Sequence, residues 1–232
     1  MRVHVAFTPS EAATAELGIV VDVVRATSTI AQALAAGYRR VLCCAEVEQA
    51  RALRASLSDA VVGGERDAVR IDGFDVGASP REFLEPLAET LVLSTTNGTR
   101  AILAAAERCG EVVLGSLLNL AAVAAAARGG VGAGPGAGDV AILCAGFKGT
   151  FAFDDAYCAG RIVESLGGDP TDAARAASLL ARAYPRALDG LNARTYGPPG
   201  LEADIAFCAR VDALTVVPRF VRMVGSAAEI VA

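Results

Sequence analysis

The sequence predicts an α/β fold with three layers (α/β/α), in which helices cover both faces of a largely parallel or mixed central sheet. Short β-branched runs alternate with alanine-rich helical patterns along almost the whole chain. With 232 residues and 53% hydrophobic content, the chain can bury a sheet on both faces. We therefore expect one domain over residues 1–232, with a glycine-rich surface loop at 129–138.

In the first half of the chain, short apolar runs predict strands and periodic alanine-rich stretches predict helices. Residues 2–7 alternate, whereas 18–21 form a continuous apolar run of the type buried on both faces. The helix expected over 26–36 ends before Gly37, a residue suited to a helix C-cap. The next elements are a strand at 40–44, a helix at 46–57 with Glu and Arg outward, and a strand at 60–62. Residues 68–80 show no period and predict a long ordered loop, which in a compact domain is usually functional.

The second half continues the same alternation. Apolar runs predict further strands at 91–94, 111–114, 140–144 and 214–217, the last stopped by Pro218. Helical patterns fill the intervals, at 99–108, 119–127, 154–166, 171–183 and 203–210. Since ligands of such sheets bind beyond the carboxyl ends of the strands, we expect five strand-end residues to line one crevice. These are Asp22, Glu65, Thr95, Ser116 and Cys144.

Composition argues against several classes of function. The net charge is −5 and the 21 Lys and Arg residues are scattered, so we expect no nucleic-acid partner. No apolar run reaches the roughly 18 to 20 residues that span a bilayer, and no signal-like start is visible. We therefore expect a cytoplasmic protein without a membrane partner. The mean hydropathy of +0.44 makes a buried interface in a homodimer an expectation as well.

Histidine and cysteine usage narrows the chemistry. His4 is the only histidine, which argues against His-ligated zinc and against Ser–His or Cys–His nucleophiles. The six cysteines show neither paired metal-ligand spacing nor the density of a secreted scaffold. Cys144 follows a strand, but without a histidine to activate it we expect a small residue packed near the site. Any acid–base or metal chemistry must come from carboxylates, hydroxyls or thiols.

The junction at 95–100 has the composition of an oxyanion site. A strand end that leads into a helix gathers free backbone N–H groups at the positive end of the helix dipole. Hydroxyl groups add short donors, a glycine allows close backbone approach, and an arginine offers a planar fork. The residues expected to bind the anion are Thr95, Thr96, Asn97, Gly98, Thr99 and Arg100.

Two carboxylate–arginine pairs follow other strands, Asp22 with Arg25 and Glu65 with Arg66. Taken alone, Asp22 is also typical of a helix N-cap, and Glu65 with Arg66 of a buried salt bridge. Beside an anion site, they indicate Mg²⁺-assisted phosphoryl chemistry, because Mg²⁺ takes carboxylate and phosphate oxygens while arginines neutralise the transferring group. We expect Asp22 and Glu65 to hold the metal, with Asp155 as a further ligand through water.

The loop at 72–80 offers a second carboxylate and a hydroxyl. Its glycines and Asp75 suit tight turns, and Ser79 before Pro80 resembles a helix N-cap that can also face a ligand. Either Asp22 or Asp75 would activate water, and direct attack by Asp22 on phosphorus stays open. The glycine spacing matches neither a dinucleotide fingerprint nor a Walker loop, so NAD and ATP are not expected.

Taken together, these motifs resemble the 2-phosphosulfolactate phosphatase family, whose members depend on Mg²⁺. The resemblance runs from about residue 20 to 220. The matching segments are 21–29, 64–66, 73–80, 95–100, 115–119, 144–146, Asp155 with 159–160, 204–205 and 217–218. Two departures stand out: the family usually has Glu-Asp at 154–155, where this chain has Asp-Asp, and a Ser/His/Gly-rich segment at 191–197.

The resemblance implies hydrolysis of 2-phospho-3-sulfolactate, a small and doubly anionic phosphoester, to 3-sulfolactate and phosphate. In the family this step belongs to coenzyme M biosynthesis. The resemblance also adds residues expected near the substrate: Ser79, Ser116, Asn119, Cys144 and Gly146. Two alternatives stay open, a phosphatase for another small 2-phospho-carboxylic acid and a non-catalytic protein that binds sulfonate or phosphate metabolites.

Overall fold

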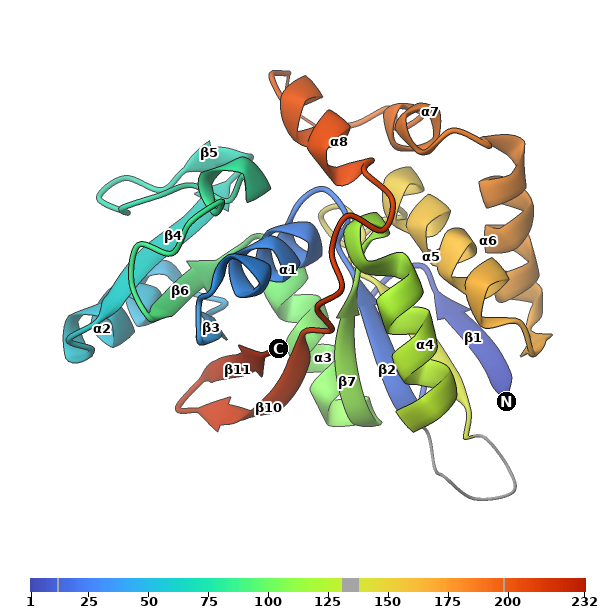
Figure 1. Cartoon of the computed structure of the whole chain (residues 1–232), viewed down its shortest axis with the longest axis horizontal. Helices are drawn as coiled ribbons and strands as arrows, with labels where there is room; N and C mark the ends of the chain where they lie inside the picture. Colours follow the sequence, from blue (N-terminus) through green and yellow to red (C-terminus); the bar gives the residue numbers. More distant parts are fainter. Residues whose placement is uncertain (12, 131–137, 198) are drawn as a thin grey trace.

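The structure is a computed structural model that describes residues 1–11, 13–130, 138–197 and 199–232. Within these ranges, eleven strands form one mixed sheet in the order β5-β4-β6-β3-β11-β10-β7-β2-β8-β1-β9. Helices lie against both faces of this sheet (Figure 1). The predicted α/β class with a mixed central sheet is therefore confirmed.

The strands and helices mostly fall where the hydrophobic pattern predicts them. The strands are β1 (Arg2–Ala6), β2 (Ala15–Val21), β3 (Arg40–Cys43), β4 (Ala60–Arg66), β5 (Val69–Arg70), β6 (Thr90–Ser94), β7 (Cys109–Gly115), β8 (Val140–Cys144), β9 (Asp169–Pro170), β10 (Arg219–Val224) and β11 (Ala227–Val231). The helices are α1 (Ala26–Ala36), α2 (Val47–Ser56), α3 (Gly98–Arg108), α4 (Leu120–Gly130), α5 (Phe153–Leu166), α6 (Asp172–Ala183), α7 (Ala187–Asn192) and α8 (Glu202–Cys208). Two short 3₁₀ turns, η1 (Pro80–Glu82) and η2 (Leu117–Asn119), complete the described elements.

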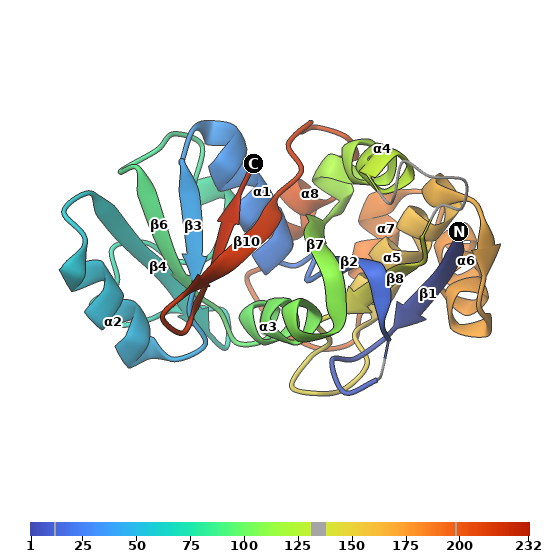
Figure 2. The same ribbon diagram turned by 90° about the horizontal axis from the view of Figure 1, so that it is seen from below.

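The sheet consists of two parallel halves joined by an antiparallel hairpin. Strands β4, β6 and β3 pair in parallel on one side, and β7, β2, β8 and β1 do so on the other. The hairpin β10–β11 lies between them and pairs antiparallel with β3 and β7 (Figure 2). Three antiparallel pairings in succession reverse the strand direction from one half to the other.

Three apolar clusters bury the two faces. One face of β1, β2 and β8 packs against α4, α5 and α6. The opposite face, which also includes residues of β3 and β6, packs against α1 and α3. A smaller cluster places α2 over β3, β4 and β6. Within the described ranges, no helix is long and apolar enough to cross a membrane.

The hairpin and the end of the chain differ from the sequence prediction. Residues 214–217, predicted as a strand, form none; instead this segment bonds to the turn after β7, with Leu214 N donating to Leu118 O at 2.8 Å. The strand β10 begins only after Pro218, and the sequence prediction missed both β10 and β11. Helix α7 was also missed. Most of the predicted loop at 129–138 lies outside the described residues, although Gly129 belongs to α4.

Candidate active site

A cavity opens where segments of both halves of the sheet meet. The residues of β2, β4, β6 and the loops after them that line this inner cavity include Asp22, Arg25, Glu65, Thr95, Thr96 and Asn97. The stretch after β8 and the irregular segment before α8 close it with Phe147, Lys148, Arg194 and Tyr196. The structure thus brings six of the predicted site residues together.

Asp22 is a buried carboxylate of the inner cavity with one free oxygen and a raised pKa. Its Oδ1 accepts the backbone N–H of Ala26 at 3.2 Å, so one oxygen caps the start of α1. Its other oxygen, Oδ2, receives no hydrogen bond from the residues that the structure describes. Burial, with a smaller contribution from the nearby charges of Glu65 and Asp154, raises the pKa of Asp22 from 3.8 to about 7. Oδ1 therefore bonds to the first residue of α1, whose N-cap residue is Arg25, while Oδ2 stays available.

Gly98 lies against this free oxygen. A Cβ at this position would lie 2.8 Å from Asp22 Oδ2, which is closer than real Cβ atoms come. The absence of a side chain allows the start of α3 to approach the carboxylate. The hydroxyls of Thr95 and Thr99 lie 3.2 Å apart beside it, and Thr95 Oγ1 accepts the Thr99 N–H at 3.1 Å. This part of the predicted anion segment is hence packed around Asp22.

Glu65 joins two segments of the cavity wall. Its Oε1 accepts the Thr96 N–H at 2.9 Å, and its Oε2 accepts the Ala68 N–H at 2.7 Å. Each oxygen keeps a second lone pair, because a carboxylate oxygen can accept two bonds. Thr96 also places a buried hydroxyl here that has no hydrogen-bond partner among the described residues.

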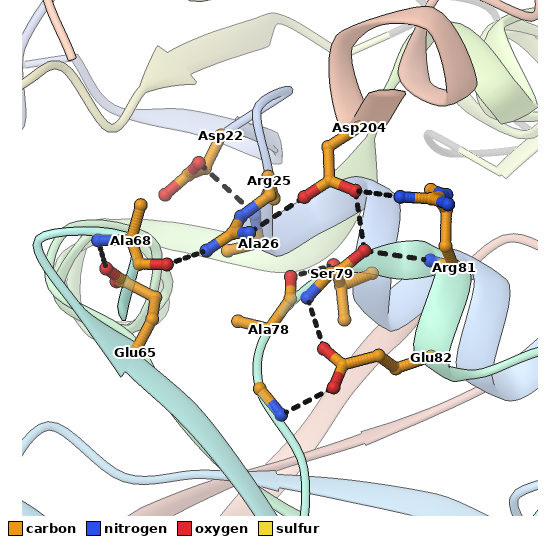
Figure 3. A network of polar contacts seen from close by, with 12 residues as sticks. Asp22, Arg25, Ala26, Glu65, Ala68, Ala78, Ser79, Arg81, Glu82 and Asp204 are labelled. Carbon is orange, nitrogen blue, oxygen red and sulfur yellow. Dashed lines mark hydrogen bonds and ion pairs between the residues drawn. The ribbon is translucent and has the colours of Figure 1, made fainter. Parts of the chain in front are cut away.

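Arg25 is held at the cavity by a buried ion pair (Figure 3). Its Nη1 donates to Asp204 Oδ2 at 2.8 Å, and the two side chains are only 9% and 7% exposed. Its Nη2 donates to the carbonyl oxygen of Ala68 at 3.3 Å. The opposite oxygen of Asp204 accepts the Ser79 hydroxyl at 2.6 Å.

A second arginine and a tyrosine form the far wall. Arg194 lies 3.5 Å from Asp154 Oδ2, and both side chains are buried. The hydroxyl of Tyr196 donates to Asp154 Oδ1, and its ring stacks on Phe147 with centroids 4.5 Å apart. Burial raises the pKa of Asp154, while the bond from Tyr196 and the charge of Arg194 lower it in part.

A shallower outer groove adjoins the inner cavity and shares part of its wall. Arg66, Arg100 and Lys148 line it, so it is rich in positive charge. Lys148 also forms a 2.6 Å ion pair with Asp67 at the shared wall. Arg66 itself is tied to its surroundings, donating to Ala45 O and to the Ser94 hydroxyl, each at 3.0 Å.

Several predicted site residues lie outside both spaces. Asp75 is exposed, accepts the Val62 N–H at 2.9 Å and lies 3.7 Å from Arg54, so it does not face Asp22. Ser79 caps η1 in a reciprocal arrangement with Glu82. The expectation that all five strand-end residues line one crevice is therefore met only by Asp22, Glu65 and Thr95.

Four further residues predicted at the site are buried in the interior instead. Ser116 and Asn119 are fully buried and bond to each other, with the Ser116 hydroxyl 2.9 Å from Asn119 Oδ1. Asp155 bridges two strand ends by accepting the N–H groups of Val23 and Gly146 at 2.9 and 3.0 Å. Cys144 is also fully buried, and burial raises the pKa of its thiol well above the ordinary value, in keeping with a packing role.

Comparison with known proteins places this site in a family. A family model described as 2-phosphosulpholactate phosphatase matches residues 4–222, nearly the whole chain. The chain belongs to the 2-phosphosulfolactate phosphatase family. It is 40% identical to a probable 2-phosphosulfolactate phosphatase of Thermus thermophilus over 98% of both chains. A probable enzyme of the same name from Pseudothermotoga lettingae is 34% identical over 94% of this chain and 96% of its own.

For a member of this family, the fit to a divalent cation can be judged from the oxygens on the cavity wall. Within the described ranges, no three His, Cys, Asp or Glu side chains converge as a preformed metal site. Asp22 and Glu65 nevertheless offer unused lone pairs, and Mg²⁺ commonly takes only one or two carboxylates plus phosphate and water. The pKa of Asp22 is raised mainly by burial and in part by the charges of Glu65 and Asp154, and a cation would offset the second effect. The residues present therefore fit Mg²⁺ with two protein carboxylates that line the cavity, whereas Asp155 lines neither the inner cavity nor the adjoining groove.

Sequence reasoning missed five residues of the site: Asp67, Lys148, Asp204, Arg194 and Tyr196. Two signals were visible. Lys148 is the only lysine in the chain, and segment 191–197 departs from the usual family pattern. Asp204 lies in a matching motif, but no local pattern pairs it with Arg25, which is 179 positions away.

Proposed function

We propose that this protein is a Mg²⁺-dependent phosphatase that hydrolyses 2-phospho-3-sulfolactate to 3-sulfolactate and phosphate. The observation that carries the proposal is Asp22, which lines a cavity together with Glu65 and Arg25 and whose Oδ2 has no hydrogen-bond partner among the described residues. Family membership and the names of the relatives support the phosphoester substrate. A role in coenzyme M biosynthesis and a cytoplasmic location remain part of the proposal.

In this proposal, Asp22 and Glu65 hold the metal. Bound Mg²⁺ would neutralise phosphate charge and lower the pKa of water. Arg25 keeps three of its five N–H groups after its bonds to Asp204 and Ala68, and these can bind phosphate oxygens. The buried hydroxyl of Thr96 adds a further donor at the same wall.

Of the two carboxylates considered as the base, Asp22 is the one that faces the cavity. Asp22 can accept the proton of an attacking water only while its Oδ2 is not bound to the metal, and in that state a pKa of about 7 suits this role near neutral pH. Direct attack by Asp22 on phosphorus uses the same oxygen and would leave a phosphorylated aspartate. Acid quenching during turnover distinguishes the two routes, because only direct attack leaves phosphate covalently bound to the protein.

The second negative group of the substrate needs a positive partner away from Asp22. The outer groove supplies one, since Arg66, Arg100 and Lys148 line it and it adjoins the inner cavity. We infer that phosphate lies by Arg25 and that sulfonate points toward this groove. Arg100 is exposed and only loosely paired with Glu46 at 3.9 Å, so it is free to turn toward a ligand.

The proposal is tested by phosphate release from a panel of small phospho-acids, with Mg²⁺ and with EDTA. The panel contains 2-phosphosulfolactate, phospholactate and phosphoglycolate. We expect metal-dependent turnover with 2-phosphosulfolactate as the preferred substrate. A preference for a carboxylate analogue would replace the substrate assignment, and binding without release would replace the enzyme assignment by a metabolite-binding role.

Asp22→Asn tests the site itself. We expect it to abolish Mg²⁺-dependent turnover while the protein stays folded, because the amide removes the metal-binding charge and the proton acceptor. Glu89→Gln is the matched control, since Glu89 forms an exposed ion pair with Arg39 that lies at neither space. Near-normal turnover in the Asp22 variant would overturn the assignment.

A further inference from the structure

The guanidinium of Arg25 is fixed by a residue that comes from a distant part of the chain. Asp204 lies in α8, and its Oδ2 accepts a bond of 2.8 Å from Arg25 Nη1. The other oxygen of Asp204 is also occupied, by the Ser79 hydroxyl at 2.6 Å, and Arg81 lies 3.8 Å away. Figure 3 shows Asp204 between Arg25 on one side and Ser79 with Arg81 on the other. The carboxylate is therefore held in one orientation.

Ser79 is itself held in place by hydrogen bonds within the 3₁₀ turn η1. Its hydroxyl accepts the Arg81 N–H at 3.3 Å, while Glu82 Oε2 accepts the Ser79 N–H at 3.2 Å. A chain of fixed contacts thus runs from η1 through Asp204 to Arg25. Since Arg25 lines the inner cavity and Asp204 does not, Asp204 can influence a ligand only through Arg25.

Glu229 is an equally buried carboxylate that forms ion pairs away from the cavity, and it serves as a comparison for Asp204. Glu229 in β11 is 8% exposed and bonds to Arg40 at 3.1 Å and to Arg222 at 2.6 Å. It lies in the hairpin region and lines neither the inner cavity nor the outer groove. The difference between the two carboxylates lies in where their arginines point.

We propose that Asp204 is a positioning residue that holds the Arg25 guanidinium toward the phosphate of the substrate. Docking of α8 is thereby a condition for phosphate binding. This inference rests on the proposed phosphatase function, but its phosphate-binding part can be tested without turnover.

The first test compares Asp204→Asn with Glu229→Gln in the full-length protein. Because displacing a reacting group by about 1 Å can cost roughly a hundredfold in rate, we expect kcat/KM of the Asp204 variant to fall by about that factor. Its affinity for inorganic phosphate, measured by calorimetry, should fall as well. Glu229→Gln should lose stability but keep kcat/KM and phosphate affinity. Ser79→Ala, which keeps the ion pair and removes its support, should shift both readouts in the same direction by less.

The second test uses chemical rescue, which a purely structural role would not affect. Arg25→Ala should regain part of its turnover when free guanidinium ion is added at millimolar concentration. If Asp204 positions the guanidinium, the double variant Arg25→Ala/Asp204→Asn should show no such rescue.

Wild-type phosphate affinity in Asp204→Asn, or rescue that does not depend on Asp204, would overturn the inference even if the wild-type protein is an active phosphatase. If the wild-type protein binds phosphate in an Asp204-dependent way but releases none from any phospho-acid, the positioning role stands and the proposed function fails.

Discussion

Replacing Gly160 by alanine should destabilise the protein, although alanine is the better helix former. Gly160 lies in the middle of α5, where this helix crosses α6. A Cβ at this position would overlap the carbonyl group of Ala177, lying 2.6 Å from its carbon and 2.9 Å from the Cβ of Ala181. Ordinary contacts of a Cβ begin near 3.4 Å, so the two helices would have to move apart.

The expected size follows from two opposed terms. Overpacking costs about 1 to 3 kcal/mol, and here the obstacle is backbone, which favours the upper end. Alanine regains about 1 kcal/mol of helix propensity over glycine. The net loss is about 2 kcal/mol, which lowers Tm by about 4 to 8 °C in a protein of this size.

The same substitution at Gly129 is the matched control. Gly129 lies near the end of α4 and is exposed, and no atom of the described residues would lie within 4 Å of an added Cβ. Gly129→Ala should therefore leave Tm unchanged or raise it by up to about 4 °C. Thermal and urea unfolding followed by circular dichroism measure both variants. If Gly160→Ala is as stable as the wild type, the close crossing of α5 and α6 is refuted.

Other predictions address charge. Hydrogen bonds from Arg222 and Arg40 outweigh the effect of burial and lower the pKa of Glu229 below 4.5. Glu229→Gln should therefore be less stable than the wild type at pH 7, and this difference should disappear as the pH falls below 4.5. Urea unfolding at several pH values tests this. The Mg²⁺ concentration for half-activation should rise as pH falls below about 7, because protonated Asp22 cannot bind metal; unchanged activation at pH 6 would contradict it. Arg100→Gln should raise KM by about fivefold with little change in kcat, since exposed charge pairs contribute up to about 1 kcal/mol; steady-state kinetics decide.

The parallel part of the fold was predictable because its signals are local. The continuous apolar run of β2 and the alternating run of β1 indicate strands without knowledge of their partners. The hairpin had a signal that was not used: Gly225 and Ser226 separate two apolar runs, and Gly225 adopts a positive φ of 60°. The order of the strands in the sheet was not predictable from local signals, because it depends on pairings such as that of β11 with β3, which are separated by most of the chain.

The site was predicted in part for the same reason. Asp22, Glu65 and Thr95 follow strands, and the carboxyl-end rule for a parallel sheet predicted them in one crevice. The cavity does hold all three, although β2 runs in the opposite direction to β4 and β6. The rule could not separate them from Asp155, because it does not say which carboxylates line the cavity and which bond to backbone N–H groups behind it. Asp204 and Arg194 come from segments after the parallel strands, so no strand-end argument reaches them.

The central position of the β10–β11 hairpin has a consequence for assembly. Both strands follow every other strand in the sequence, yet they fill the middle of the sheet rather than an edge. During synthesis, β3 and β7 each have one unpaired edge until the hairpin is made, and such edges can associate with other chains. The bond between Arg40 and Glu229 spans 189 positions, so the step that unites the two halves closes one of the longest loops in the chain. A destabilising substitution in the hairpin should therefore separate the sheet into two partly formed halves, rather than disorder only one edge of it.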